Sequence, residues 1–287
     1  MSTADATTGR PFEGSARLGR SGRVLADARG EGRAALVGYL PVGYPSVEHS
    51  IEAMRALTEG TDGRGVDLVE IGMPYSDPVM DGLAIQHATT RALQHGVRTR
   101  DVLKAVEAVA ATGRQAMVMI YWNLVEHYGV DAFARDLAAA GGSGLITPDL
   151  TPDEAGPWIE ASDVHGLDRV FLVAPSSTPD RVMSTTHACR GWVYATSVMG
   201  VTGARSETSD AAPVLVERIR SVAPELPVGV GLGVSTAAQA AEVARFADAV
   251  IVGSALVKCL IEAESSRDLG ALRGVVDALA GGVRGLG

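Results

Sequence analysis

Eight short apolar runs recur along the chain, and segments with helical periodicity separate them. The apolar runs span residues 35–40, 66–71, 116–121, 144–147, 170–174, 192–196, 228–230 and 249–252. Most are continuously apolar, which is typical of strands that a parallel sheet buries on both faces. The helical segments span residues 47–59, 100–111, 131–140, 153–163, 179–186, 211–222 and 236–246. Eight strands that alternate with helices over about 250 residues predict a (β/α)8 TIM barrel.

An open, doubly wound sheet is the alternative fold for alternating strands and helices. That fold needs the glycine fingerprint G-x-G-x-x-G after its first strand, whereas residues 40–45 read LPVGYP. The sequence shows no linker after residue 32, so residues 33–287 are expected to form a single barrel domain that carries the catalytic site. Residues 1–32 are an N-terminal extension, in which residues 17–29 are expected to form one extra capping helix.

Composition excludes several classes of function. The 287 residues include 34 acidic and 25 basic side chains, and a formal charge of −9 disfavours a general nucleic-acid binder. No apolar run approaches the roughly 20 residues that span a bilayer, and the N-terminus lacks the apolar core of a secretory signal. Two cysteines are too few for a disulfide scaffold. We therefore expect a soluble cytoplasmic protein whose partners include neither nucleic acid nor membrane.

Glu70 is the first candidate for a catalytic residue. It lies near the end of the second predicted strand, in the otherwise apolar run VEIG, and barrel active sites are built at the carboxyl ends of strands. A carboxylate in such a run must be desolvated or paired, and burial raises its pKa towards acid–base work at neutral pH. An ion pair with an arginine is the structural alternative. The position at a strand end favours catalysis.

Two loops at the same end of the predicted barrel are unusually long. About 45 residues separate the second and third strands, and they begin with the loop 72–82, followed by a helical segment over 83–94. This extended loop contains Asp77 and Asp81, for which spacing alone does not decide between capping a turn and acting in a site. The loop 197–210 after the sixth strand has the length and composition of a mobile lid.

Glycine-rich turns follow the last two predicted strands. They read GVGLGVS at residues 229–235 and VGSA at residues 252–255, and each leads towards a helix. Backbone N–H groups at a helix N-terminus bind anions, and phosphate sites at these two positions recur in barrels. Tight packing of strand against helix also favours glycine, but two such turns together favour a phosphate site. Thr202 and Gly203 in the lid would add contacts from a third side.

Other kinds of catalytic site find little support in the sequence. The six histidines are scattered, and no His, Cys, Asp or Glu cluster has the spacing of metal ligands. The chain contains no G-x-S-x-G motif, and no lysine lies in a predicted strand to form an imine. The residues therefore indicate acid–base chemistry by carboxyl groups on a phosphorylated small molecule, without a metal.

Four segments together resemble the tryptophan synthase α subunit family. They are VEIGMPYSDPVMDGLAIQ at 69–86, VMGVTG at 198–203, VGLGVS at 230–235 and VGSALVK at 252–258. The similarity extends from about residue 34 to the C-terminus, and the segments follow one another in barrel order. The chain departs from the family at Leu83, where proline is more frequent, and in its longer N-terminal extension.

This resemblance implies a lyase that cleaves indole-3-glycerol phosphate, by a retro-aldol reaction, into indole and glyceraldehyde 3-phosphate. It further implies that Glu70 is the acid–base catalyst and that Asp81 holds the indole N–H. The other substrate-binding residues that it implies are Tyr39, Tyr121, Tyr194, Thr202, Gly203, Gly233, Gly253 and Ser254.

The resemblance also implies a partner. In the family, indole passes through a tunnel to a β subunit, which carries pyridoxal phosphate and joins indole to serine within an αββα heterotetramer. The chain itself then needs no cofactor, and Asp77 and Pro78 match the loop that faces the partner. Two alternatives stay open: a stand-alone lyase that releases indole, and a silent subunit that only activates its partner. The presence of both Glu70 and Asp81 disfavours the silent subunit.

Overall fold

The strands of this protein form one nearly closed parallel barrel. The computed structural model describes residues 17–78, 80–196, 211–231 and 233–285. Its strands are β1 (Ala35–Pro41), β2 (Leu68–Gly72), β3 (Gln115–Met119), β4 (Gly144–Ile146), β5 (Asp168–Val170), β6 (Leu172–Val173), β7 (Val193–Thr196), β8 (Val228–Gly231) and β9 (Ala249–Val252). The last strand pairs with the first, with Ala35 opposite Ala249, and the two edges of the sheet, β5 and β6, follow each other directly in the chain, so the barrel is nearly closed. The predicted (β/α)8 barrel is confirmed.

The fifth strand of the barrel is divided into two segments. β5 pairs with β4 up to Val170, and β6 pairs with β7 from Leu172 onwards. Phe171 lies between the two segments, and its carbonyl oxygen accepts a hydrogen bond from the Tyr194 N–H at 3.1 Å. The chain thus changes its pairing partner at Phe171. The nine strand segments of the described residues therefore occupy eight strand positions of the barrel, and the single strand predicted over residues 170–174 is divided in two.

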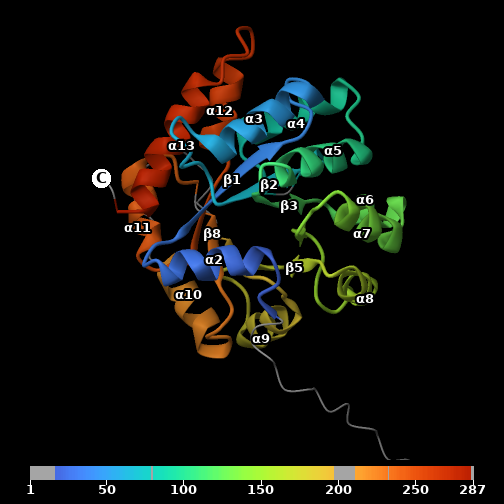
Figure 1. Cartoon of the computed structure of the whole chain (residues 1–287). Helices are drawn as coiled ribbons and strands as arrows, with labels where there is room; N and C mark the ends of the chain where they lie inside the picture. The colour runs from blue at the N-terminus through green and yellow to red at the C-terminus, as the bar shows by residue number, and fades with distance from the viewer. Residues whose placement is uncertain (1–16, 79, 197–210, 232, 286–287) are drawn as a thin grey trace, which may run out of the picture.

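Helices surround the barrel on its outer side (Figure 1). They are α3 (Val47–Glu59), α4 (Leu83–Gln94), α5 (Thr99–Ala110), α6 (Trp122–Tyr128), α7 (Val130–Ala139), α8 (Gly156–His165), α9 (Pro179–Ala188), α10 (Ala211–Val222), α11 (Ala237–Ala244), α12 (Ser254–Glu262) and α13 (Gly270–Val283). One further helix, α2 (Ser21–Gly30), lies across an end of the barrel instead (Figure 1). The short helix α6 was not expected. It begins directly after Tyr121, where the Asp149 carboxylate accepts a hydrogen bond from the Trp122 N–H at 3.0 Å.

Alternation along the strands divides the buried side chains into two layers. The larger layer fills the space between strands and helices. The smaller one, which we call the interior cluster, consists of Leu25, Ala28, Ala35, Val37, Leu68, Met117, Ile146, Val170, Trp192, Tyr194, Ala249 and Ile251. Because successive side chains of a strand point to opposite faces, Glu70 faces the same side as Leu68, two residues before it. The Glu70 side chain therefore points into the barrel.

The expected N-terminal helix, α2, closes the amino-terminal end of the barrel. Figure 1 shows α2 lying across that end, and its Leu25 and Ala28 belong to the interior cluster. The carboxylate of Asp168 on β5 accepts two hydrogen bonds from Ser21 at the start of the helix, one from its N–H at 2.7 Å and one from its Oγ at 2.6 Å.

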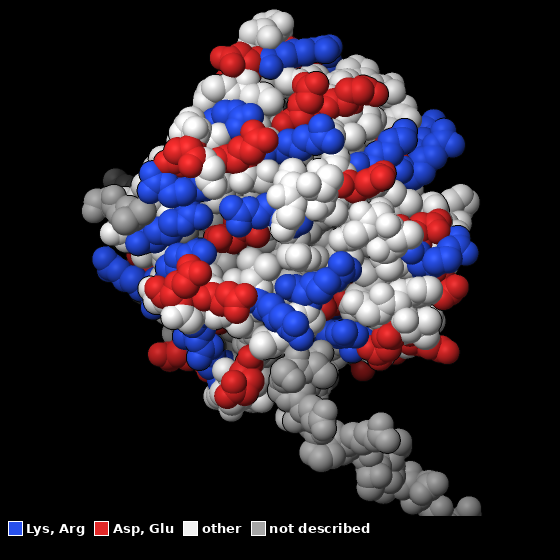
Figure 2. All heavy atoms as spheres, viewed as in Figure 1, with Lys and Arg blue, Asp and Glu red and all other residues white. Residues whose placement is uncertain are grey.

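On the face of the molecule that carries α2, basic and acidic side chains are interspersed rather than gathered in a basic stripe (Figure 2).

Replacing Ser21 with alanine should destabilise the fold, because Asp168 is fully buried and would lose one of its two bonds to α2. We expect the free energy of unfolding to fall by about 1.5–3 kcal/mol, the usual range for a hydrogen bond to a charged group. Urea unfolding measures this change. The matched control is Ser266→Ala, at an exposed turn, where the expected change is within about 0.5 kcal/mol. Equal effects of the two variants would contradict the anchoring of α2 by Asp168.

Candidate active site

Glu70 is a buried carboxyl group on β2 whose side chain points into the barrel. It lies on β2 opposite Tyr39 on β1 and Met117 on β3. Its exposed fraction is 1%, and its Oε2 atom has no hydrogen-bond partner among the described residues. No arginine of the described segments forms an ion pair with it either. The structural alternative of an Arg–Glu pair thus has no support in the described part of the chain.

Asp81 is the second carboxyl group of the site. It lies half-buried in the loop after β2. Burial raises its pKa to about 6, whereas burial and, to a smaller extent, the charge of Asp81 raise the pKa of Glu70 to about 8. Near pH 7 Glu70 is therefore mostly protonated and Asp81 mostly ionised. Two carboxyl groups whose surroundings separate their pKa values are suited to different roles, one as a proton donor and the other as a fixed negative charge.

Three tyrosines predicted for the substrate pocket are nearly buried, and two of them face the carboxyl groups. Burial first, and then the charges of Asp81 and Glu70, raise the pKa of Tyr39 well above its ordinary value. Burial and then the charges of the same two carboxyl groups also raise the pKa of Tyr194. Tyr121 contributes to the raised pKa of Tyr39. The structure thus places these five side chains near one another: Tyr39 on β1, Glu70 on β2, Tyr194 on β7, Tyr121 just after β3 and Asp81 in the loop after β2.

Glycines make room for two of these tyrosine rings. A methyl group at Gly72 would lie 2.3 Å from the hydroxyl oxygen of Tyr39, and one at Gly231 would lie 2.4 Å from that of Tyr194. Contacts below 3.0 Å require a shift of the neighbouring atoms, so larger residues at these positions would displace the rings. Sequence reasoning missed this role, because it depends on which strands are neighbours in the barrel.

The loop that carries Asp81 spans the barrel mouth. Near its start, the Tyr75 ring stacks on Tyr121 with ring centroids 4.2 Å apart and planes inclined by 14°. At its other end Gly82 reaches α12, since a methyl group there would lie 3.6 Å from Ser254 Oγ. The loop leads from β2 to α4 and passes beside the residues at the end of β3 and at the start of α12, which places Asp81 over the mouth. Tyr75 was not predicted from the sequence, although an aromatic residue in a polar loop indicates that its ring packs against another part of the chain.

The two residues predicted to face a partner lie in the outer part of this loop. Asp77 is exposed and accepts a hydrogen bond from Ser76 Oγ at 2.7 Å, and Pro78 is half-buried. Leu83, where the sequence departs from the resembled family, is 86% exposed at the first position of α4. Leucine at this position therefore contacts little of the chain itself.

Glycine turns predicted to hold phosphate follow the neighbouring strands β8 and β9. Gly253 is the N-cap residue of α12, and among the described residues no side chain caps this helix, so its first N–H groups can bind a ligand. Gly233 has a φ of +67°, in the left-handed region that favours glycine, and α11 begins four residues later. Ser254 opens α12 beside the Asp81 loop. Thr202 and Gly203, with the predicted lid 197–210, lie outside the described residues.

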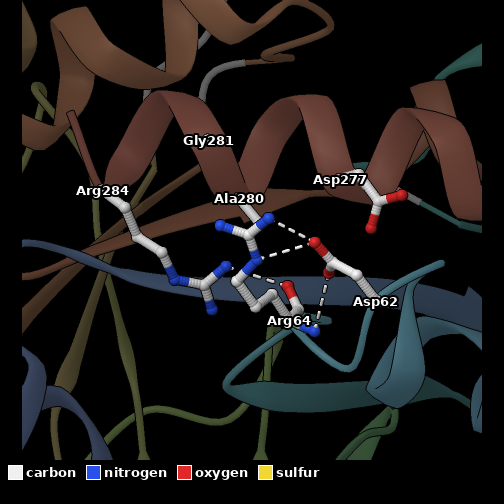
Figure 3. Close-up of a pocket in the computed structure, with 6 residues that line it drawn as sticks. All are labelled: Asp62, Arg64, Asp277, Ala280, Gly281 and Arg284. Carbon is white, nitrogen blue, oxygen red and sulfur yellow. Dashed lines mark hydrogen bonds and ion pairs between the residues drawn. The ribbon is translucent and has the colours of Figure 1, made fainter. Parts of the chain in front are cut away.

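A separate hollow of about 210 Å³ lies at the other end of the barrel, between the loop after α3 and helix α13. Its lining residues are Asp62, Arg64, Asp277, Ala280, Gly281 and Arg284 (Figure 3). Arg64 pairs with Asp62, and Arg284 donates hydrogen bonds to the carbonyl oxygens of Arg64 and Gly65. Asp277 accepts hydrogen bonds from the Thr61 N–H at 3.1 and 3.2 Å. The charged groups of the lining thus have partners in the loop before β2, and the hollow is distinct from the site around Glu70.

Comparison with known proteins identifies the family. The sequence profile described as tryptophan synthase alpha chain matches residues 25–276. The chain belongs to the tryptophan synthase alpha chain family. A tryptophan synthase alpha chain from Salinispora arenicola is 63% identical over 258 residues, which are 90% of this chain and 95% of the relative. That from Mycobacterium marinum is 59% identical over 265 residues, 92% of this chain and 95% of the relative.

Solved structures give the same result for the tryptophan synthase alpha chain fold. A structure of Mycobacterium tuberculosis tryptophan synthase superposes with a TM-score of 0.85 at 58% identity, over 93% of this chain and 99% of that one. A tryptophan synthase complex from Pyrococcus furiosus superposes with a TM-score of 0.77 at 29% identity, over 87% and 98% of the two chains. Membership in this family makes the chain an enzyme of tryptophan synthesis.

Two further observations concern metals and membranes. In the described segments of this tryptophan synthase alpha chain, no three His, Cys, Asp or Glu side chains come together in a way that would hold a metal ion. Among the same residues, no helix combines the length and the apolar character that are needed to cross a membrane.

Proposed function

We propose that this chain cleaves indole-3-glycerol phosphate into indole and glyceraldehyde 3-phosphate as the α subunit of tryptophan synthase. The observation that carries the proposal is the pair Glu70 and Asp81. In the barrel of this family, a buried and mostly protonated carboxyl group lies beside a mostly ionised one at the mouth. A retro-aldol cleavage needs a proton donor and a separate negative charge in one pocket.

The reaction moves one proton in each direction. Glu70 donates a proton to indole C3, and the ring nitrogen becomes positive. The hydroxyl group beside the C3–C1 bond then returns a proton to Glu70, its carbon becomes the aldehyde, and the bond breaks. The bond's electron pair restores the aromatic ring and neutralises the nitrogen. Glu70 therefore ends each cycle in its starting state, as general acid–base catalysis requires.

Other residues hold the substrate during these steps. The carboxylate of Asp81 accepts a hydrogen bond from the indole N–H and stabilises the ring as it becomes positive. Tyr39, Tyr121 and Tyr194 enclose the indole in an apolar pocket. The phosphate group binds at the glycine turns after β8 and β9, and the residues that we assign to it are Gly203, Gly233, Gly253 and Ser254, with Thr202 closing the lid.

We propose that the chain works with a β subunit in an αββα heterotetramer. Asp77 and Pro78, in the outer part of the loop over the mouth, would face that partner. Indole would pass through a tunnel to the β subunit, where pyridoxal phosphate supplies the chemistry that joins indole to serine. Within this chain, we assign catalysis to residues 33–287 as one barrel domain preceded by the extension 1–32, and we place the assembly in the cytoplasm.

Incubation of the chain with indole-3-glycerol phosphate, with and without a β subunit, tests the function. We expect slow indole formation by the chain alone, because its loops stay free to open and admit water, and a faster rate when the β subunit favours the closed state. Equal rates would instead identify a stand-alone lyase. If neither mixture forms indole, the chain is a silent subunit and the proposed function is wrong.

Substitution of Gly253 with aspartate tests the phosphate site. The new carboxylate would lie at the uncapped start of α12 and repel the phosphate group, so the affinity for a phosphorylated substrate analogue should fall at least about 100-fold. Titration calorimetry measures the affinity. Because a methyl group at this position would lie 3.2 Å from the Tyr39 ring, Gly253→Ala is the control for crowding alone. A folded Gly253→Asp variant with unchanged affinity would contradict the assignment.

A further inference from the structure

Trp192 lies directly beneath Tyr194 in the barrel interior. It precedes Tyr194 by two residues, so both side chains point inwards, and its exposed fraction is 0%. The two rings are stacked, with centroids 5.7 Å apart and planes inclined by 29°. We propose that Trp192 is a positioning residue, whose ring forms the floor of the active site, supports Tyr194 and keeps water away from Glu70. This inference rests on the proposed function.

The β8 backbone fixes where the Trp192 ring can lie. A methyl group at Gly229 would lie 2.6 Å from Cζ3 of Trp192 and 2.9 Å from its Cε3. A methyl group at Gly231, two residues further along β8, would likewise lie 2.4 Å from the hydroxyl oxygen of Tyr194. Two glycines on one strand thus face two stacked rings on its neighbour. Any larger residue at Gly229 must push the indole ring out of its place.

The Trp192 ring also packs in the interior cluster between the pocket and the capping helix. Leu25 and Ala28 of α2 belong to the same interior cluster as Trp192 and Tyr194. The ring is therefore the largest side chain of the layer that separates the active site from the amino-terminal end of the barrel. Removing part of its volume leaves a cavity below Tyr194, into which that ring or water can move.

The protonation of Glu70 depends on this packing. The titratable groups that face Glu70 in the described segments are Tyr39 on β1, Asp81 in the loop after β2, and Tyr194 on β7. No basic group is among them. Burial is the largest cause of the raised pKa of Glu70, ahead of the charge of Asp81. A floor that lets water approach would therefore lower the pKa of Glu70 towards its ordinary value.

Four variants of the full chain, assayed with the β subunit, test the inference: Trp192→Phe, Gly229→Ala, their double variant, and Trp158→Phe. Trp158 is a matched control, since it is also fully buried and its Nε1 also lacks a hydrogen-bond partner among the described residues, but it lies on α8 in the outer layer. The measurements are the pH dependence of kcat for indole formation, KM, and the melting temperature.

We expect the pH profile to separate the two tryptophans. Because Glu70 acts in its protonated form, a lower pKa moves the alkaline limb of kcat to lower pH, by at least about half a unit in Trp192→Phe. Trp158→Phe should lower the melting temperature and leave this limb in place. An unmoved limb in a folded Trp192→Phe variant would overturn the inference.

The glycine variants provide an independent outcome. Gly229→Ala should lower kcat at least about tenfold, because the new methyl group displaces the Trp192 ring. Phenylalanine lacks the outer ring that carries Cζ3 and Cε3, so the double variant should recover the kcat of Trp192→Phe. Absence of this rescue would also overturn the inference. Wild-type enzyme that forms no indole would overturn the proposed function and this inference together, whereas an active wild type with unmoved profiles overturns this inference alone.

Discussion

Replacing Glu70 with glutamine should lower kcat for indole formation by about 10²–10⁴-fold, the usual contribution of a positioned acid–base group. Glutamine preserves the shape and the hydrogen-bonding capacity of the side chain but cannot exchange a proton. Substrate should therefore still bind, and the loss should appear in kcat rather than in KM. An assay that follows the absorbance of indole measures both constants. A variant that keeps more than about a tenth of the wild-type turnover would show that Glu70 is not the proton carrier.

Stability provides a control for this variant. The pKa of Glu70 rises from an ordinary value of 4.5 to about 8 on folding. A carboxyl group with a raised pKa favours the folded state fully below the unfolded pKa, and this contribution is lost as the pH rises through the folded pKa. Between about pH 4.5 and 8 the wild type should therefore lose stability relative to Glu70→Gln. A variant that is inactive yet at least as stable at pH 8 separates catalysis from folding.

The architecture of the barrel could be predicted because strands buried on both faces are continuous runs of apolar residues in the sequence. Two features of the fold have no such local sequence pattern. The chain changes its pairing partner at Phe171 within one apolar run. Helix α6 begins where the Trp122 N–H donates a hydrogen bond to Asp149, a residue 27 positions further along the chain. Tertiary partners of this kind are not encoded in local periodicity.

The candidate site divides in the same way. Glu70 was predictable because a charged residue in an apolar strand end is rare and costly. Spacing left Asp81 undecided and the family resemblance implied its role; in the structure, its burial beside Glu70 distinguishes it from the exposed Asp77 in the same loop. The stacking of Tyr75 on Tyr121, and the fit of Trp192 against Gly229, involve residues at neighbouring strand positions of the barrel. Such contacts require the register of the nearly closed sheet, which the sequence alone does not specify.

Asp81→Asn and Asp81→Ala should lose activity to different extents, and the difference isolates the hydrogen bond to the indole N–H. Both variants remove the charge that helps to raise the pKa of Glu70, so the alkaline limb of kcat should move to lower pH by the same amount in both. Asparagine retains an acceptor oxygen, whereas alanine leaves the N–H of the substrate unpaired in a buried site.

At a fixed pH near 7, the expected order of turnover is wild type, Asp81→Asn, Asp81→Ala and then Glu70→Gln. The step from asparagine to alanine should be about 10–100-fold, which corresponds to the cost of one unpaired buried donor of about 1–3 kcal/mol. Asp153→Asn, whose carboxylate is 77% exposed and pairs with Arg181, is the matched control and should retain wild-type turnover. Equal activity of Asp81→Asn and Asp81→Ala would mean that Asp81 acts through its charge alone, because an N–H acceptor cannot be lost without effect.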